Sequence, residues 1–218
     1  MFIWGTTGAF SDNTLSKSHL PTSTAPLLEK VIDRMEARYG QKGFSSTFFQ
    51  TSTLKVLEIT DSATGRIFIK RPDRMRWEYD TPEKQLIISD GETLWIHRPD
   101  DNQVMIGKAP AFFNGGRGAG FLSDITQIRN HFNIDLITGG ESLEYTLNLI
   151  PKVPTDEVKL VILAVSKETF DVLRVTTYNA YEDETQLIFS DLQFYEALDD
   201  SLFHFSPPEK SEILEIGE

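Results

Sequence analysis

Apolar and polar residues alternate regularly between Ile67 and Pro99, and this pattern predicts four short strands joined by tight polar turns. Met75, Trp77 and Tyr79 share one parity, and the charged residues between them occupy the other. The same two-residue step recurs in three pairs: Ile67 and Ile69, Leu86 and Ile88, and Leu94 and Ile96. Because successive side chains of a strand point to opposite faces, we expect a sheet with one apolar face and one solvated face. Such a sheet either packs a core or holds an apolar ligand.

The remaining chain predicts one N-terminal helix and further short strands. A helix is expected at Pro26–Tyr39, where apolar residues recur at helical spacing. Strands are expected at Phe44–Thr53, Leu54–Thr60 (followed by a turn at Asp61–Gly65), Asn102–Gly107, Phe132–Thr138, Leu143–Ile150, Val158–Val165, Val172–Tyr178, Glu184–Phe189 and Leu192–Glu196. Between them, Ala109–Asn130 predicts two short helices around the glycine-rich Gly115–Gly120. Roughly eleven or twelve strands and three helices are typical of a meandering antiparallel sheet, curled into a barrel or half-barrel.

Composition narrows the class of protein. The 218 residues predict one domain at 26–218, preceded at 1–25 by a disordered leader or the tail of a signal peptide. The net charge of −12 argues against nucleic acid and anionic membrane surfaces as partners. The absence of cysteine excludes disulfides and cysteine-based zinc sites, and it leaves the redox compartment open.

Few residues carry recognisable chemistry. The four histidines are scattered without metal-ligand spacing, and the glycines at Gly115–Gly120 fit neither a phosphate loop nor a dinucleotide fingerprint. We therefore expect a binding protein and not an enzyme, with no cofactor and no metal. Arg71 ends a strand and precedes Pro72, so its guanidinium could donate to carbonyls of an overlying helix. From the residues alone, a solvated turn arginine remains the alternative.

Several short motifs carry a resemblance to a known family. They are FSSTFFQ at Phe44–Gln50, KRP at Lys70–Pro72, Trp77, SDG at Ser89–Gly91, TLW at Thr93–Trp95, Pro99 and FHFSPP at Phe203–Pro208. In this order and spacing the chain resembles the periplasmic lipoprotein carrier family, LolA, over about Leu27–Ile213. The resemblance implies a mainly β (α+β) fold: an unclosed antiparallel β half-barrel of about eleven strands, with a lid of three α-helices over a hydrophobic cavity. Gly115–Gly120 and Pro151–Glu157 do not match the family pattern.

The resemblance also implies a function: a periplasmic chaperone that binds the acyl chains of lipoproteins and carries them from the inner to the outer membrane. Its implied partners are acylated lipoproteins, an inner-membrane ABC lipoprotein-releasing transporter and, where one exists, an outer-membrane receptor of similar fold; we expect a monomer. Arg71 matches the family's arginine that latches the lid. The acyl-chain cavity is expected to be lined by Met75, Trp77, Leu86, Ile88, Leu94, Ile96, Phe112, Phe121, Leu122 and Ile125, although ordinary core residues would look the same in sequence. A lipoprotein- or lipid-sensing regulatory protein of the same fold is the alternative.

Overall fold

The computed structural model describes residues 24–40, 43–109, 125, 128–137 and 142–216. The predicted leader at 1–25 lies outside these ranges except for its last two residues, which belong to the first helix. Three predicted cavity residues also lie outside the described residues: Phe112, Phe121 and Leu122.

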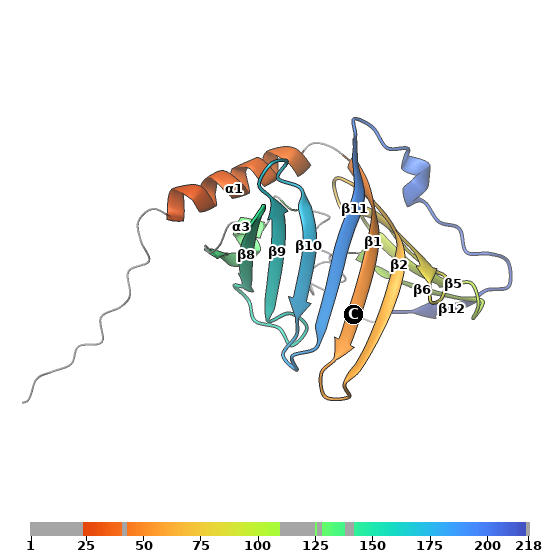
Figure 1. The fold of residues 1–218 in the computed structure, drawn as a ribbon. Helices are drawn as coiled ribbons and strands as arrows, with labels where there is room; N and C mark the ends of the chain where they lie inside the picture. Colours follow the sequence, from red (N-terminus) through yellow and green to blue (C-terminus); the bar gives the residue numbers. More distant parts are fainter. Residues whose placement is uncertain (1–23, 41–42, 110–124, 126–127, 138–141, 217–218) are drawn as a thin grey trace, which may run out of the picture.

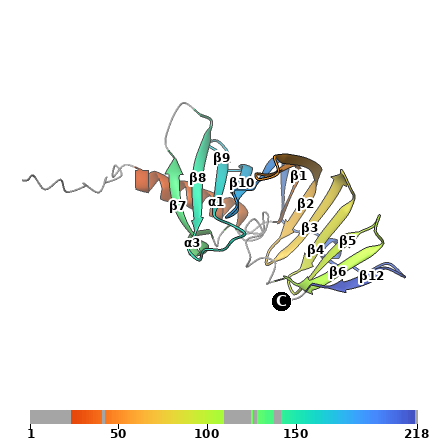
Figure 2. The same ribbon diagram turned by 90° about the horizontal axis from the view of Figure 1, so that it is seen from below.

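The described residues form one unclosed sheet of twelve strands (Figures 1 and 2). In chain order these are β1 (Gly43–Leu54), β2 (Ile59–Lys70), β3 (Arg74–Thr81), β4 (Gln85–Asp90), β5 (Thr93–Arg98), β6 (Gln103–Lys108), β7 (Phe132–Ile137), β8 (Glu144–Pro151), β9 (Leu160–Ser166), β10 (Val172–Tyr178), β11 (Glu184–Tyr195) and β12 (Glu212–Glu215). The spatial order is β12-β6-β5-β4-β3-β2-β1-β11-β10-β9-β8-β7, so β12 and β7 form the two edges. Neighbours are antiparallel except β12, which pairs with β6 in parallel. The mainly β, unclosed architecture is confirmed, with one strand more than the resemblance implies.

The described residues contain two α-helices, α1 (Thr24–Tyr39) and the short α3 (Ile128–His131), and a 3-10 helix η2 (Asp200–Phe203). The lid helices predicted within Ala109–Asn130 lie mainly outside the described residues, so the three-helix lid stays a prediction. No helix among the described residues is long and apolar enough to cross a membrane.

Two predicted strand boundaries were wrong. The chain turns after β1 at residues 55–58, and β2 then continues through the predicted turn at Asp61–Gly65. Gly65 is required inside β2, because a Cβ there would lie 2.0 Å from the carbonyl oxygen of Glu78 and 2.8 Å from the Phe48 ring. The two strands predicted between Glu184 and Glu196 are one strand, β11. The pairing with β1 shifts register between Ser45 and Thr47, and Asp191 has a φ of 54°. This irregularity interrupts the alternation of inward and outward side chains, so the sequence pattern indicated two strands.

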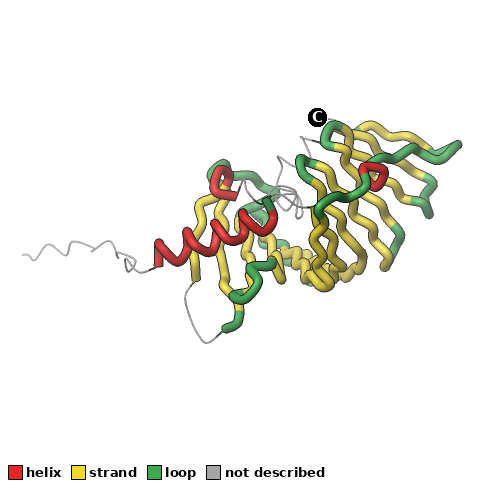
Figure 3. The backbone as a smooth tube through the Cα atoms, turned by 90° about the horizontal axis from the view of Figure 1, so that it is seen from above, coloured by secondary structure: helices red, strands yellow, loops and turns green. Residues whose placement is uncertain are grey.

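Buried side chains form two layers on opposite faces of the sheet. On the inner face, α1 lies over the β7–β10 half (Figures 1 and 3) and buries the predicted apolar stripe that includes Val31 and Met35. On the outer face, the segment from η2 to Phe205 crosses β3–β5 and inserts Phe203, which is 1% exposed. The Nζ of Lys70 fastens this segment by donating to the Leu198 carbonyl and the Asp200 carboxylate, both at 2.6 Å.

Candidate functional site

The inner face of β1–β5 is a continuous apolar surface. The strand register aligns one residue per strand across it: Ser46 opposite Ile67, Ile67 opposite Trp77, Trp77 opposite Ile87, and Ile87 opposite Ile96. Except for Ser46, this row is entirely hydrophobic, and the Ser46 hydroxyl is satisfied by donating to the Ser190 carbonyl at 2.6 Å. The alternation seen in the sequence therefore does produce one apolar face.

Three aromatic rings form the centre of this surface. The Phe48 ring lies 5.1 Å from the rings of both Trp77 and Tyr79, and the Trp77 and Tyr79 rings stack at 6.3 Å. The Tyr79 hydroxyl donates to Gln50 Oε1 at 3.1 Å. Burial raises the pKa of Tyr79 to about 12, so the phenol stays neutral at ordinary pH. Tyr79 therefore places no charge against this apolar surface.

The other half of the inner face is closed by α1. The Tyr39 hydroxyl accepts the Val172 amide hydrogen at 2.9 Å, and burial raises the pKa of this phenol as well. Arg38 forms an ion pair with Asp171 in the β9–β10 turn and lies over the Phe194 ring at 4.5 Å. A narrow apolar crevice of about 10 Å³ remains between Tyr39 and the sheet, so α1 contacts this part of the sheet closely.

Charged residues join α1 to α3. Arg129 of α3 lies 2.5 Å from Asp33, 3.2 Å from Glu36 and 3.3 Å from Glu29, all three on α1. Burial raises the pKa of Glu36, and the Arg129 charge opposes that shift. These pairs hold α3, and with it the chain entering β7, against the helix that covers the inner face.

The predicted cavity residues divide between the two faces. Met75 and Leu94 are each 2% exposed, Trp77 is 7% exposed and Ile96 is half-buried, and all four lie on the inner face. Ile125, at 1% exposed, belongs to the same buried cluster. Whether these residues contact acyl chains stays a prediction.

The inward placement of Leu86 and Ile88 was wrong. Leu86 pairs with Glu78 and Ile88 pairs with Arg76, so both lie on the outer face. Ile88 is nonetheless fully buried, because the C-terminal segment covers this face and adds the Phe203 ring.

Sequence reasoning missed this second buried cluster. Its members are Ile88, Val104 and Phe203, with Trp95, His97 and Phe205 in ring contacts beside them. The signal was present in β4, where three apolar residues follow one another at 86–88. An unbroken apolar run is typical of a strand that is buried on both faces.

The motif residues around Arg71 gather at one rim of the sheet. The buried Ser89 hydroxyl donates to the Asp73 carbonyl and accepts the Gly91 amide hydrogen, both at 3.0 Å, so the β4–β5 turn is tied to the β2–β3 turn. Arg71 is half-buried in the β2–β3 turn. The chain leaves β6 at the same rim, where the Ala109 amide donates to the Glu92 carbonyl at 2.9 Å. Arg71 and the start of the segment predicted to form the lid therefore lie at the same rim of the sheet, and the latch role of Arg71 stays a prediction.

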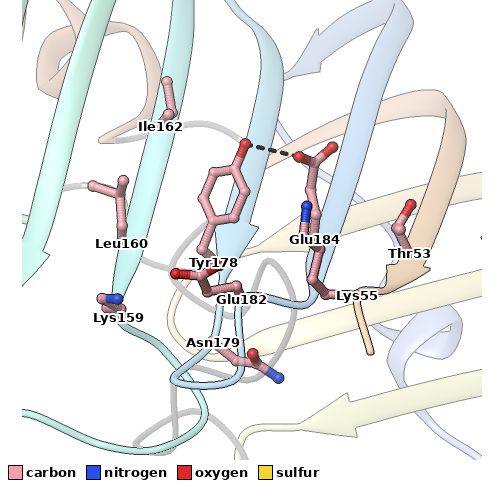
Figure 4. A pocket seen from close by; sticks show the side chains of 9 residues that line it. All are labelled: Thr53, Lys55, Lys159, Leu160, Ile162, Tyr178, Asn179, Glu182 and Glu184. Atoms are coloured by element: carbon pink, nitrogen blue, oxygen red, sulfur yellow. Dashed lines mark hydrogen bonds between the residues drawn. The ribbon is translucent and has the colours of Figure 1, made fainter. Parts of the chain in front are cut away.

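A wider pocket lies on the outer face, away from the apolar surface (Figure 4). It has a volume of about 500 Å³ and is lined by Thr53, Lys55, Lys159, Leu160, Ile162, Tyr178, Asn179, Glu182 and Glu184. The Tyr178 hydroxyl donates to Glu184 Oε2 at 2.7 Å, and this hydrogen bond raises the pKa of the phenol. The pocket combines charged side chains with the apolar Leu160 and Ile162, in contrast to the uncharged row of the inner face.

The fold and the inner face define an unclosed β half-barrel with a continuous apolar inner surface. A family model described as outer membrane lipoprotein carrier protein LolA matches residues 40–206, and the chain belongs to this family. The outer-membrane lipoprotein carrier protein of Nitrosomonas europaea is 30% identical over 171 residues, covering 78% of this chain and 82% of that protein. Its counterpart in Chromobacterium violaceum is 30% identical over 191 residues, covering 87% and 90%. An uncharacterized conserved protein from Thermus thermophilus shares the fold, with a TM-score of 0.56, 12% identity, and coverage of 87% of this chain and 99% of that chain.

Proposed function

We propose that this chain is a periplasmic lipoprotein carrier, a binding protein and not an enzyme, which shields acyl chains on the inner face of its half-barrel. The observation that carries the proposal is the unbroken apolar row from Ile67 through Trp77 and Ile87 to Ile96, four strands wide, with its aromatic cluster. The family relatives named as outer-membrane lipoprotein carriers support the same interpretation.

The energetic need for such a surface is large. Each methylene moved from water into an apolar environment contributes about 0.8 kcal/mol, so a chain of a dozen or more methylenes does not leave a membrane unshielded. An apolar face with neutral hydrogen-bonded phenols offers that shielding without an unpaired buried charge.

The proposal also includes the direction of transport and the partners of the carrier. Cargo would be received from an inner-membrane ABC lipoprotein-releasing transporter and delivered to the outer membrane. Met75, Trp77, Leu94, Ile96 and Ile125 would line the cargo site, together with the lid residues Phe112, Phe121 and Leu122. Arg71 would latch the lid, and its place at the same rim as the exit of β6 supports this role.

Displacement of an apolar dye tests the proposal. An environment-sensitive dye should bind the purified chain at about one site and should be displaced by a triacylated lipopeptide but not by its deacylated form. Equal displacement by the deacylated peptide would show that the peptide, and not its acyl chains, is recognised, and it would overturn the proposal.

A further inference from the structure

The β1–β2 hairpin ends in an exposed apolar tip. Val56 is 82% exposed and Leu57 63% exposed, and they are flanked by Leu54 at 43% and Ile59 at 46%. Exposed aliphatic side chains next to one another at a turn are unusual in a soluble domain and mark an interaction site more often than scattered ones do.

The hairpin extends beyond its neighbours in the sheet. β11 begins at Glu184, opposite Thr53, and β3 ends at Thr81, opposite Thr64, so neither neighbouring strand pairs with the tip beyond these residues (Figure 1). Leu54 and Ile59 form its last paired residues. The tip is therefore a convex, hydrogen-bonded projection.

A second turn stands beside the tip. The Lys55 amide donates to Asp183 Oδ1 at 2.9 Å, which ties the hairpin to the β10–β11 turn. That turn carries Tyr181, whose side chain is 66% exposed. Tyrosine is enriched where a protein meets the headgroup level of a bilayer, because its ring is apolar and its hydroxyl is polar.

We propose that this tip is a membrane-docking element that inserts Val56 and Leu57 into the surface of a zwitterionic phospholipid bilayer, with Tyr181 at the headgroup level. A specific protein interface buries about 800 Å² on each partner, and a convex tip with two leading aliphatic side chains cannot supply that area. A bilayer surface deforms around a narrow apolar projection, and insertion of only a few side chains gives reversible binding.

The charges around the tip select the kind of bilayer. Lys55 and Lys159 line the outer pocket next to the hairpin, together with Glu182 and Glu184 (Figure 4). Positive and negative groups in one pocket match the paired charges of a zwitterionic headgroup, and the net charge of −12 repels an anionic surface. The proposal goes beyond the carrier function, since it concerns the end of the sheet opposite the Arg71 rim.

Vesicle flotation with the cargo-free full chain tests it, using phosphatidylcholine vesicles. The unchanged chain should float with the vesicles, and Val56→Glu and Leu57→Glu should each weaken binding by about tenfold or more, because each removes an aliphatic group that would insert into the bilayer and adds a charge. The matched control is Leu143→Glu. Leu143 is 86% exposed and directly precedes β8, whose first residue, Glu144, pairs with Ser166 at the end of β9, away from the hairpin tip. This variant should bind as the unchanged chain does. All variants contain the same apolar N-terminal residues, so a difference between them is not due to that segment.

A label reports whether the tip itself inserts. The chain contains no cysteine, so Leu57→Cys and Leu143→Cys each give a single attachment site for a polarity-sensitive fluorophore. A blue shift on phosphatidylcholine vesicles is expected at position 57 and not at position 143. Failure of the unchanged chain to float, equal losses in all three glutamate variants, or binding only after anionic lipid is added would each overturn the proposal. None of these outcomes depends on whether the chain carries lipoprotein.

Discussion

The two buried faces of the β3–β4 hairpin allow the cargo surface to be tested with a matched pair of substitutions. Met75 is 2% exposed on the inner face, and Ile88 is fully buried on the outer face of the neighbouring strand. Each loses three non-hydrogen atoms beyond Cβ on replacement by alanine. The pair therefore compares equal truncations of buried side chains that differ in the face they occupy.

The two variants should lose similar stability. Truncation of a buried methionine or isoleucine to alanine costs about 2–5 kcal/mol in the free energy of unfolding. For a chain of this size that loss corresponds to a melting temperature lower by roughly 5–15 °C. Thermal melting of the cargo-free proteins followed by circular dichroism measures both.

Binding of cargo should separate them. If acyl chains lie on the inner face, Met75→Ala removes contacts worth up to about 2 kcal/mol, at about 0.8 kcal/mol per methylene-sized group. That difference corresponds to about 30-fold weaker binding of a triacylated lipopeptide in dye displacement. Ile88→Ala should bind the lipopeptide as the unchanged chain does at a temperature where both variants are folded. Equal weakening by both variants, or none by Met75→Ala, would refute the inner face as the cargo surface.

Single residues at the rim, in the aromatic cluster and in β2 give further tests. Arg71→Leu should accept lipoprotein but transfer it poorly to acceptor vesicles, because it removes charge-assisted hydrogen bonds of about 1.5–3 kcal/mol from the proposed latch; unchanged transfer would contradict the latch. Burial raises the pKa of Tyr79 from 10.0 to about 12, so its contribution to stability is present below pH 10 and lost as the pH rises to about 12. Melts across that range should show a smaller loss for Tyr79→Phe than for the unchanged chain, and an equal loss would assign the effect to other groups. Gly65→Ala should lower the melting temperature by roughly 5 °C or more, because its Cβ would lie 2.0 Å from the Glu78 carbonyl oxygen. Gly107→Ala should cost less, because the nearest atom to its Cβ would be in the Ile216 side chain, at 3.1 Å.

Local sequence pattern predicted most of the individual strands but not how they align. β10 was predicted at its observed bounds, because alternating residues between clear turns leave little choice. The phase of β4 relative to β3 was not predictable from alternation, since turn geometry decides whether Ile87 or Ile88 faces inward. A shift of one residue exchanges the two faces, and the apolar run in β4 fits either choice. β12 was missed because four residues pairing in parallel with β6 carry no strong strand signal.

The motifs that support the family resemblance have three separate physical roles in the structure. Trp77 belongs to the inner apolar wall, whereas Trp95 faces outward and lies 6.4 Å from Phe205 of the C-terminal motif. The SDG turn holds the rim by tying Ser89 to the β2–β3 turn. Sequence similarity does not distinguish the inner apolar surface, the outer cluster and the rim turn, because each of them requires particular residue types. In the proposed function, cargo contacts only the inner apolar surface, while the outer cluster covers the opposite face of the same strands and Arg71 lies at the rim. A substitution in the outer cluster should therefore change cargo binding only by lowering the stability of the fold. The face that a residue occupies, more than its burial or its place in a motif, links it to the proposed function.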